Sequence, residues 1–148
     1  MIFMFQRLRP LWIEINLDNL TYNITQIKKL LRPDVEYISV IKADAYGHGA
    51  VEVAKVCIEN GINWFAVAML DEAIELRNAG IDAPILILGY TSGVQADILV
   101  KNDLRQVCFS YELAKSMSDE AVKQGKTALI HVAVDTGMGR IGLQPNSE

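Results

Sequence analysis

One lysine stands where an apolar segment meets a polar, glycine-rich one. Residues 37–41 have the β-branched and aromatic composition of a buried strand, and Lys42 follows them directly. A lysine amine that is partly kept out of water can act as a nucleophile toward carbonyl groups. Alternatively, its ammonium group could simply extend from the strand end into solvent. The lysine alone does not decide between these two interpretations.

The surrounding sequence repeats a strand–helix pattern. Apolar runs predict strands over residues 11–17, 35–41, 64–69, 84–88, 106–109 and 128–134. Amphipathic spacing and capping residues predict helices over residues 18–31, 50–60, 71–79, 94–101 and 111–124, with Asp18 and Ser110 as N-caps. Such a repeat implies parallel strands with right-handed crossovers. A doubly wound open sheet and a (β/α)8 barrel cut near its fifth strand both fit this period.

Polar and glycine-rich segments follow three of these strands, at residues 42–49, 89–93 and 135–140. In either architecture the carboxyl ends of parallel strands share one edge of the sheet, where binding sites form. We therefore expect Lys42 and Arg140 to point into the same mouth.

Composition narrows the class of protein. The 148 residues are 51% hydrophobic with a net charge of −4, which suits a well-buried globular chain and gives no basic surface for nucleic acid. Cys57 and Cys108 lie in apolar patterns and should be buried free thiols. The two histidines form no metal-ligand set, and no apolar stretch is long enough to be a signal-peptide core or a membrane span. We expect a soluble, cytoplasmic protein.

Two segments carry a resemblance to a known family. The run Val-Ile-Lys-Ala-Asp-Ala-Tyr-Gly-His-Gly at residues 40–49 resembles the pyridoxal-phosphate attachment segment of alanine racemases. Asp-Thr-Gly-Met-Gly-Arg-Ile-Gly at residues 135–142 resembles a second characteristic segment of that family, and Trp-Ile-Glu-Ile-Asn-Leu at 12–17 also fits. The resemblance extends from about Trp12 to Pro145.

The resemblance implies a fold and a domain organisation. Residues 1–148 would form a partial N-terminal α/β barrel domain, with residues 1–11 as an extension. The fold would be roughly the first half of a TIM-type (β/α)8 barrel, as in fold-type III pyridoxal-phosphate enzymes, without the C-terminal β-domain. The full-length protein would be a homodimer. Half a barrel would leave apolar edge strands open, so we expect the isolated chain to associate.

The resemblance also implies an activity. Lys42 would bind pyridoxal 5'-phosphate covalently and act as one of two acid/bases that interconvert L-alanine and D-alanine for bacterial cell-wall peptidoglycan. Tyr46 would lie near the cofactor phosphate, and Arg140 near the cofactor's phenolic oxygen and the substrate carboxylate. The opposite base would lie outside this sequence, so the chain alone should be inactive. Alternatives are a serine or broad-specificity amino-acid racemase, a non-catalytic pyridoxal-phosphate-binding barrel and an inert structural fragment.

Other polar residues receive structural or open interpretations. Many family members carry a carbamylated lysine where this chain has Ala133, so we expect an anion, water or a repacked neighbour to support Arg140 instead. Asp135 could orient Arg140 or cap its own loop, and Tyr90 could face the site or its rim.

Structural roles are expected for the remaining polar residues: Asp44 within its turn, His48 in its loop, His131 in a strand, and Glu72, Glu75 and Arg77 on a solvated helix face.

Overall fold

Five parallel strands form one sheet in which each strand pairs with its neighbours in the sequence, in the order β1-β2-β3-β4-β5. The computed structural model describes residues 11–144. Its strands are β1 (Ile38–Val40), β2 (Trp64–Val67), β3 (Ile85–Ile87), β4 (Arg105–Cys108) and β5 (Leu129–Val132). All four pairings are parallel, so the carboxyl ends of the strands lie at one edge, as expected.

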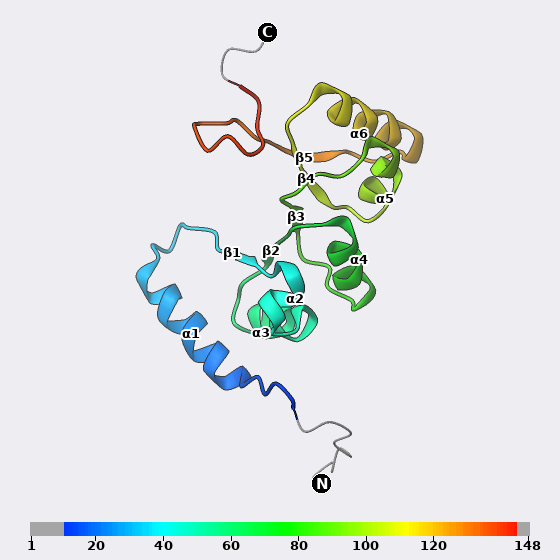
Figure 1. Cartoon of the computed structure of the whole chain (residues 1–148). Helices are drawn as coiled ribbons and strands as arrows, with labels where there is room; N and C mark the ends of the chain where they lie inside the picture. Colours follow the sequence, from blue (N-terminus) through cyan, green and yellow to red (C-terminus); the bar gives the residue numbers. More distant parts are fainter. Residues whose placement is uncertain (1–10, 145–148) are drawn as a thin grey trace.

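The helices that connect successive strands lie along one side of the sheet, and one further helix precedes β1 (Figure 1). They are α1 (Leu17–Leu30), α2 (Lys42–Gly47), α3 (Ala50–Glu59), α4 (Leu70–Asn78), the short 3-10 helix η1 (Gly93–Gln95), α5 (Ala96–Lys101) and α6 (Tyr111–Gln124). A doubly wound sheet would reverse its strand order and carry helices on both faces. Sequential order with helices on one side is instead the winding of a TIM-type barrel. The predicted half-barrel class is confirmed.

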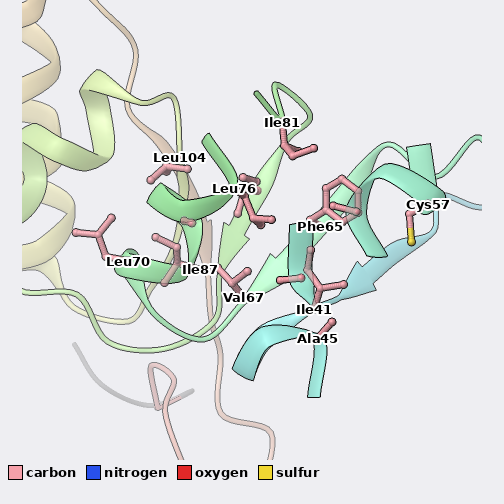
Figure 2. Packing of buried hydrophobic residues seen from close by; sticks show 14 of the residues in the cluster. Ile41, Ala45, Cys57, Phe65, Val67, Leu70, Leu76, Ile81, Ile87 and Leu104 are labelled. Carbon is pink, nitrogen blue, oxygen red and sulfur yellow. The ribbon is translucent and has the colours of Figure 1, made fainter. Parts of the chain in front are cut away.

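The core lies between the sheet and its helices (Figure 2). Alternate residues of two central strands point toward the helices, and Phe65, Val67, Ile85 and Ile87 are fully buried. Each such side chain contributes about 1.5–3 kcal/mol of stabilisation when it leaves water. On the helices, fully buried core side chains include Ala54, Ala73, Leu76, Leu99 and Met117. This packing holds the strand ends in a fixed relation to one another.

The two edge strands expose apolar side chains. In β1, Ile38 and Val40 are 37% and 43% exposed, and in β5, Ile130 and Val132 are 39% and 62% exposed. Unpaired edges of this kind favour association. Association of the isolated chain stays a prediction.

The predicted strand at residues 11–17 is wrong. Residues 11–16 pair with no strand in the described part of the chain, and Leu11 and Ile13 are 85% and 80% exposed. The first helix is capped by Asn16 rather than by Asp18: the Asn16 side chain accepts a hydrogen bond from the Asn19 N–H at 2.9 Å. Asp18 lies in the first turn instead, where its negative charge interacts favourably with the helix dipole. Most of the expected N-terminal extension, residues 1–10, lies outside the described residues.

Two local predictions, the Ser110 cap and the two buried thiols, are confirmed. Ser110 caps α6 by accepting a hydrogen bond from the Leu113 N–H at 3.3 Å. Cys57 and Cys108 are buried free thiols, and burial raises the pKa of the Cys57 thiol despite its hydrogen bond with Ser39. Within residues 11–144, no helix has the length and apolar character needed to cross a membrane.

Candidate functional site

Lys42 begins a left-handed helical turn at the carboxyl end of β1. Residues 43–46 all have φ between 50° and 55°, a conformation that costs L-residues about 1–2 kcal/mol each. A left-handed turn has the same number of residues per turn as a right-handed one, so Lys42 and Tyr46 fall on the same side. The Lys42 Nζ lies 5.9 Å from the centre of the Tyr46 ring. The strained turn therefore brings the two expected cofactor-binding residues of this segment together.

Hydrogen bonds close this turn on itself. The Ala45 N–H donates to the Ile41 carbonyl at 2.9 Å. Asp44 accepts the N–H of Ala50 at 2.7 Å, which ties the turn to the first residue of α3. His48 Nδ1 lies 2.9 Å from the Ala45 carbonyl oxygen, which can only accept, so His48 is held by the backbone as predicted.

Glu72 links this turn to the next strand. One of its carboxylate oxygens accepts the Ala43 N–H at 2.6 Å, and the other accepts the N–H groups of Ala68 at 2.6 Å and Met69 at 3.0 Å. These three donors lie just beyond the carboxyl ends of β1 and β2. The interpretation of Glu72 as part of a solvated helix face is wrong, because its side chain turns back onto the strand ends.

Three further hydrogen bonds extend this brace, the set of contacts that Glu72 makes with the strand ends, across the sheet. The Gly89 N–H donates to the Ala68 carbonyl at 3.1 Å, and a Cβ on Gly89 would lie 2.4 Å from that oxygen, so only glycine fits. The fully buried Gln106 donates to the Gly89 carbonyl at 2.7 Å, and Thr91 donates to Gln106 at 2.7 Å. The loops after β1, β2 and β3 are thus held in one connected network. The only sequence signals for this network were the polar residues Gln106, in a predicted strand, and Thr91, in the polar segment at residues 89–93.

Arg140 lies on a loop that is closed at its base. Leu143 pairs with the end of β5: its N–H donates to the Ala133 carbonyl at 2.8 Å, and its carbonyl accepts the Asp135 N–H at 2.9 Å. Gly142 permits this return because its φ is +146° and a Cβ there would lie 2.5 Å from the Asp135 backbone nitrogen. The Arg140 side chain is exposed and makes no hydrogen bond or ion pair within residues 11–144.

Asp135 caps the loop rather than orienting Arg140. One carboxylate oxygen accepts the N–H groups of Gly137 at 2.9 Å and Gly139 at 3.0 Å, and the other accepts from the Gln144 amide at 3.2 Å. The hydrogen bonds from Gly139 and Gly137 lower the pKa of the Asp135 carboxyl group. The open choice between the two roles is settled in favour of the cap.

This cap makes a pH-dependent contribution to stability. Because the folded pKa is lowered, the contribution is complete above the ordinary pKa of an aspartate and is lost as pH falls through the folded value. We expect Asp135→Asn to lower the midpoint of thermal unfolding at neutral pH, and the difference from wild type to vanish in acid. Thermal unfolding followed by circular dichroism across the acidic range measures it. An unchanged difference at low pH would contradict this assignment.

Lys42 and Arg140 share the carboxyl edge but lie at its two ends. Lys42 follows β1 and Arg140 follows β5, the two outer strands of the sheet. Four strand spacings of about 4.8 Å separate these strands by roughly 19 Å along the sheet. The expectation of a common edge is confirmed, whereas their convergence on one ligand stays a prediction.

The remaining candidate residues, His131 and Tyr90, lie beside aromatic side chains. His131 contacts the Trp64 ring edge-on at 6.1 Å, and Arg105 stacks over that ring at 4.6 Å, toward the amino ends of the strands. Tyr90 is 63% exposed beside Phe109. No group of three metal-ligating side chains occurs in the part of the chain that the structure describes.

Comparison with known proteins identifies the family to which this geometry belongs. The family described as alanine racemase, N-terminal domain, matches residues 15–148. The chain belongs to the alanine racemase family. An alanine racemase of Clostridium tetani is 52% identical over 145 residues, which cover 98% of this chain and 37% of that protein. The chain thus spans little more than a third of the length of this relative.

Solved structures of the family agree with the fold. An alanine racemase of Clostridium difficile 630 superposes with a TM-score of 0.90 at 48% identity, covering 94% of this chain and 37% of that one. A histidine racemase of Leuconostoc mesenteroides superposes with a TM-score of 0.78 at 31% identity, covering 88% and 35%. Racemases named for different substrates therefore share this half-barrel.

Proposed function

We propose that the complete gene product containing this chain racemises alanine with pyridoxal phosphate, and that this chain supplies the lysine that holds the cofactor. The observation that carries the proposal is the placement of Lys42 at the carboxyl end of β1, half-buried and beside Tyr46, in a chain of the alanine racemase family. Its amine makes no hydrogen bond or ion pair among the described residues, so it is available to a carbonyl ligand.

The residues of the turn fit such a cofactor. Lys42 would hold pyridoxal phosphate covalently through Nζ, and the Tyr46 phenol, 61% exposed on the same side, would donate a hydrogen bond to its phosphate. The bound cofactor would supply an electron sink for the charge left when an amino acid loses its Cα proton. Once the amine of the amino acid has displaced Lys42 from the cofactor, the freed Lys42 amine would move that proton on one face of the substrate, and a base outside this chain would serve the other face.

Arg140 would bind the substrate carboxylate and the cofactor's phenolic oxygen. A guanidinium presents its donors in a rigid plane that matches a carboxylate. Asp135 shapes the loop on which Arg140 lies, but no residue within 11–144 forms a hydrogen bond or ion pair with the guanidinium itself. Ala133 offers no polar side chain to Arg140, so support of Arg140 by an anion, water or a repacked neighbour stays part of the proposal.

The alternatives concern the substrate and the need for catalysis. A serine or broad-specificity racemase keeps every role above, and the histidine racemase that shares this fold supports keeping that alternative open. A non-catalytic pyridoxal-phosphate-binding barrel would keep Lys42 alone. A homodimer, a cytoplasmic location and a role in supplying D-alanine for peptidoglycan belong to the proposal for the complete gene product.

Proton exchange at Cα tests this function. The complete gene product, incubated with pyridoxal phosphate and L-alanine in deuterium oxide, should form D-alanine and replace the Cα proton by deuterium, as followed by NMR and chiral chromatography. L-Serine and L-histidine should exchange more slowly. Faster exchange of serine or histidine would favour another substrate, and no exchange with any amino acid despite cofactor binding would favour the non-catalytic barrel.

A further inference from the structure

We propose that Glu72 is a positioning residue for Lys42: its carboxylate fixes the backbone from which Lys42 presents its amine to the cofactor. This inference rests on the proposed function, since it concerns how Lys42 meets its carbonyl partner. Glu72 itself would touch neither cofactor nor substrate. It lies in the first turn of α4 and is partly buried.

The contact with Ala43 is the first step. The Ala43 N–H belongs to the peptide bond that follows Lys42, and its acceptor is the Glu72 carboxylate at 2.6 Å. A short hydrogen bond to a charged acceptor is roughly twice as strong as one between neutral groups. Glu72 therefore fixes the peptide plane immediately after the Lys42 Cα.

That peptide plane begins the left-handed turn. Four consecutive non-glycine residues in this conformation would favour a return to ordinary backbone angles if nothing held them. Such a return would separate Lys42 from Tyr46, because the two face each other only across this turn. The Glu72 carboxylate holds the start of the turn, and Asp44 holds its end through Ala50.

The other oxygen of Glu72 makes this hold rigid. It accepts the N–H groups of Ala68 and Met69 beyond β2, where the Ala68 carbonyl in turn accepts the N–H of Gly89. Gly89 is bound by the buried Gln106 of β4. The Glu72 carboxylate thus connects the backbone at Lys42, through hydrogen bonds, to three neighbouring strands.

Both oxygens must accept for this arrangement to hold, which makes Glu72→Gln an informative change. An amide of nearly the same size has one acceptor oxygen, and its NH₂ group would face another N–H donor. One of the two links must break. Glu75→Gln is the matched control, because Glu75 is exposed one turn further along α4 and makes no side-chain hydrogen bond or ion pair in the described chain.

The test uses the complete gene product and pyridoxal phosphate alone. Borohydride trapping measures the rate at which the cofactor attaches to Lys42, and induced circular dichroism per bound cofactor reports how firmly its orientation is fixed. For Glu72→Gln we expect trapping to slow roughly 10- to 100-fold, as for a small displacement of a reacting group, and the induced signal to fall severalfold. Glu75→Gln should match wild type in both.

The outcomes separate this inference from the proposed function. Failure of wild type to trap the cofactor at Lys42 would refute the proposed function. Normal wild-type trapping with an unchanged rate and induced signal in Glu72→Gln would refute the positioning role alone. A purely structural role would lower the unfolding midpoint without changing the induced signal per bound cofactor, and would also overturn the proposal.

A measurement on the wild-type protein decides the question if Glu72→Gln does not fold. The amide protons of Ala43, Ala68 and Met69 are all donated to one carboxylate, so NMR should find all three protected against exchange with deuterium oxide. Rapid exchange of the Ala43 amide proton would contradict the bridge on which the proposal depends.

Discussion

Lys42→Ala should abolish covalent binding of pyridoxal phosphate. Wild type mixed with the cofactor should develop an absorbance band near the visible edge, because a lysine amine condensed with the cofactor's carbonyl absorbs there. Alanine offers no amine, so the band should be absent and exchange of the alanine Cα proton should fall below detection. Absorbance spectroscopy and NMR measure the two effects.

Lys55→Ala is the matched control for this prediction. Lys55 is an exposed lysine of α3 whose ammonium pairs with Glu52 at 2.8 Å, far along the helix from the turn. Surface pairs of this kind contribute about 0–1 kcal/mol, so this variant should bind cofactor as wild type does. A band that persists in Lys42→Ala and disappears in Lys55→Ala would show that the wrong lysine has been assigned.

Arg77→Leu should destabilise the fold by about 3 kcal/mol, because a half-buried charged donor leaves several carbonyls without a partner. The Arg77 guanidinium donates to the carbonyls of Ile81 at 2.5 Å, Ala83 at 2.8 Å and Asn102 at 3.0 Å. It thereby joins the segment that enters β3 to the end of α5. Burial lowers the pKa of Arg77, with Asp82 and Asp103 acting against this, yet a guanidinium stays charged at neutral pH.

Chemical denaturation followed by circular dichroism measures this loss. Arg32→Leu makes the same change at an exposed arginine whose partner is the equally exposed Asp34 at 3.4 Å. We expect that control to change the free energy of unfolding by no more than about 0.5 kcal/mol. Equal effects of the two substitutions would mean that the carbonyl contacts of Arg77 carry no stability.

The strand–helix repeat could be predicted from sequence because its signals are local. Unbroken apolar runs marked β2 and β3, whose residues are buried on both faces, and Ser110 marked the start of α6. The winding of the sheet could not be predicted from the period, since both candidate folds use the same unit. It was decided by sequential strand order with helices on one side.

The errors arose where a pattern depends on distant partners. Apolar and polar residues alternate over 11–16 as in a strand, but this pattern forms no strand unless a neighbouring strand is there to pair with it. Glu72, Glu75 and Arg77 look alike as charges on one helix. Only the fold shows that Glu72 reaches the carboxyl ends of the strands, that Arg77 reaches their amino ends and that Glu75 stays in solvent.

The candidate site was predicted in part. Lys42, Tyr46 and Arg140 were found from motifs, and the structure brings Lys42 and Tyr46 together. The left-handed turn that does so carries little local signal, because of its four residues only Asp44 is of a type that adopts this conformation at all readily, whereas alanine and tyrosine ordinarily avoid it. The brace through Glu72, Gly89 and Gln106 was missed for a related reason: each of its hydrogen bonds joins segments that are brought together only by the sheet.

Peptide mapping after borohydride reduction tests the central claim most directly. The complete gene product is mixed with pyridoxal phosphate, reduced, digested and examined by mass spectrometry. We predict one reduced cofactor per chain, on the peptide that contains Lys42, with its phosphate intact. A cofactor attached to another lysine, or none attached at all, would contradict the assignment of Lys42 as the residue that holds it.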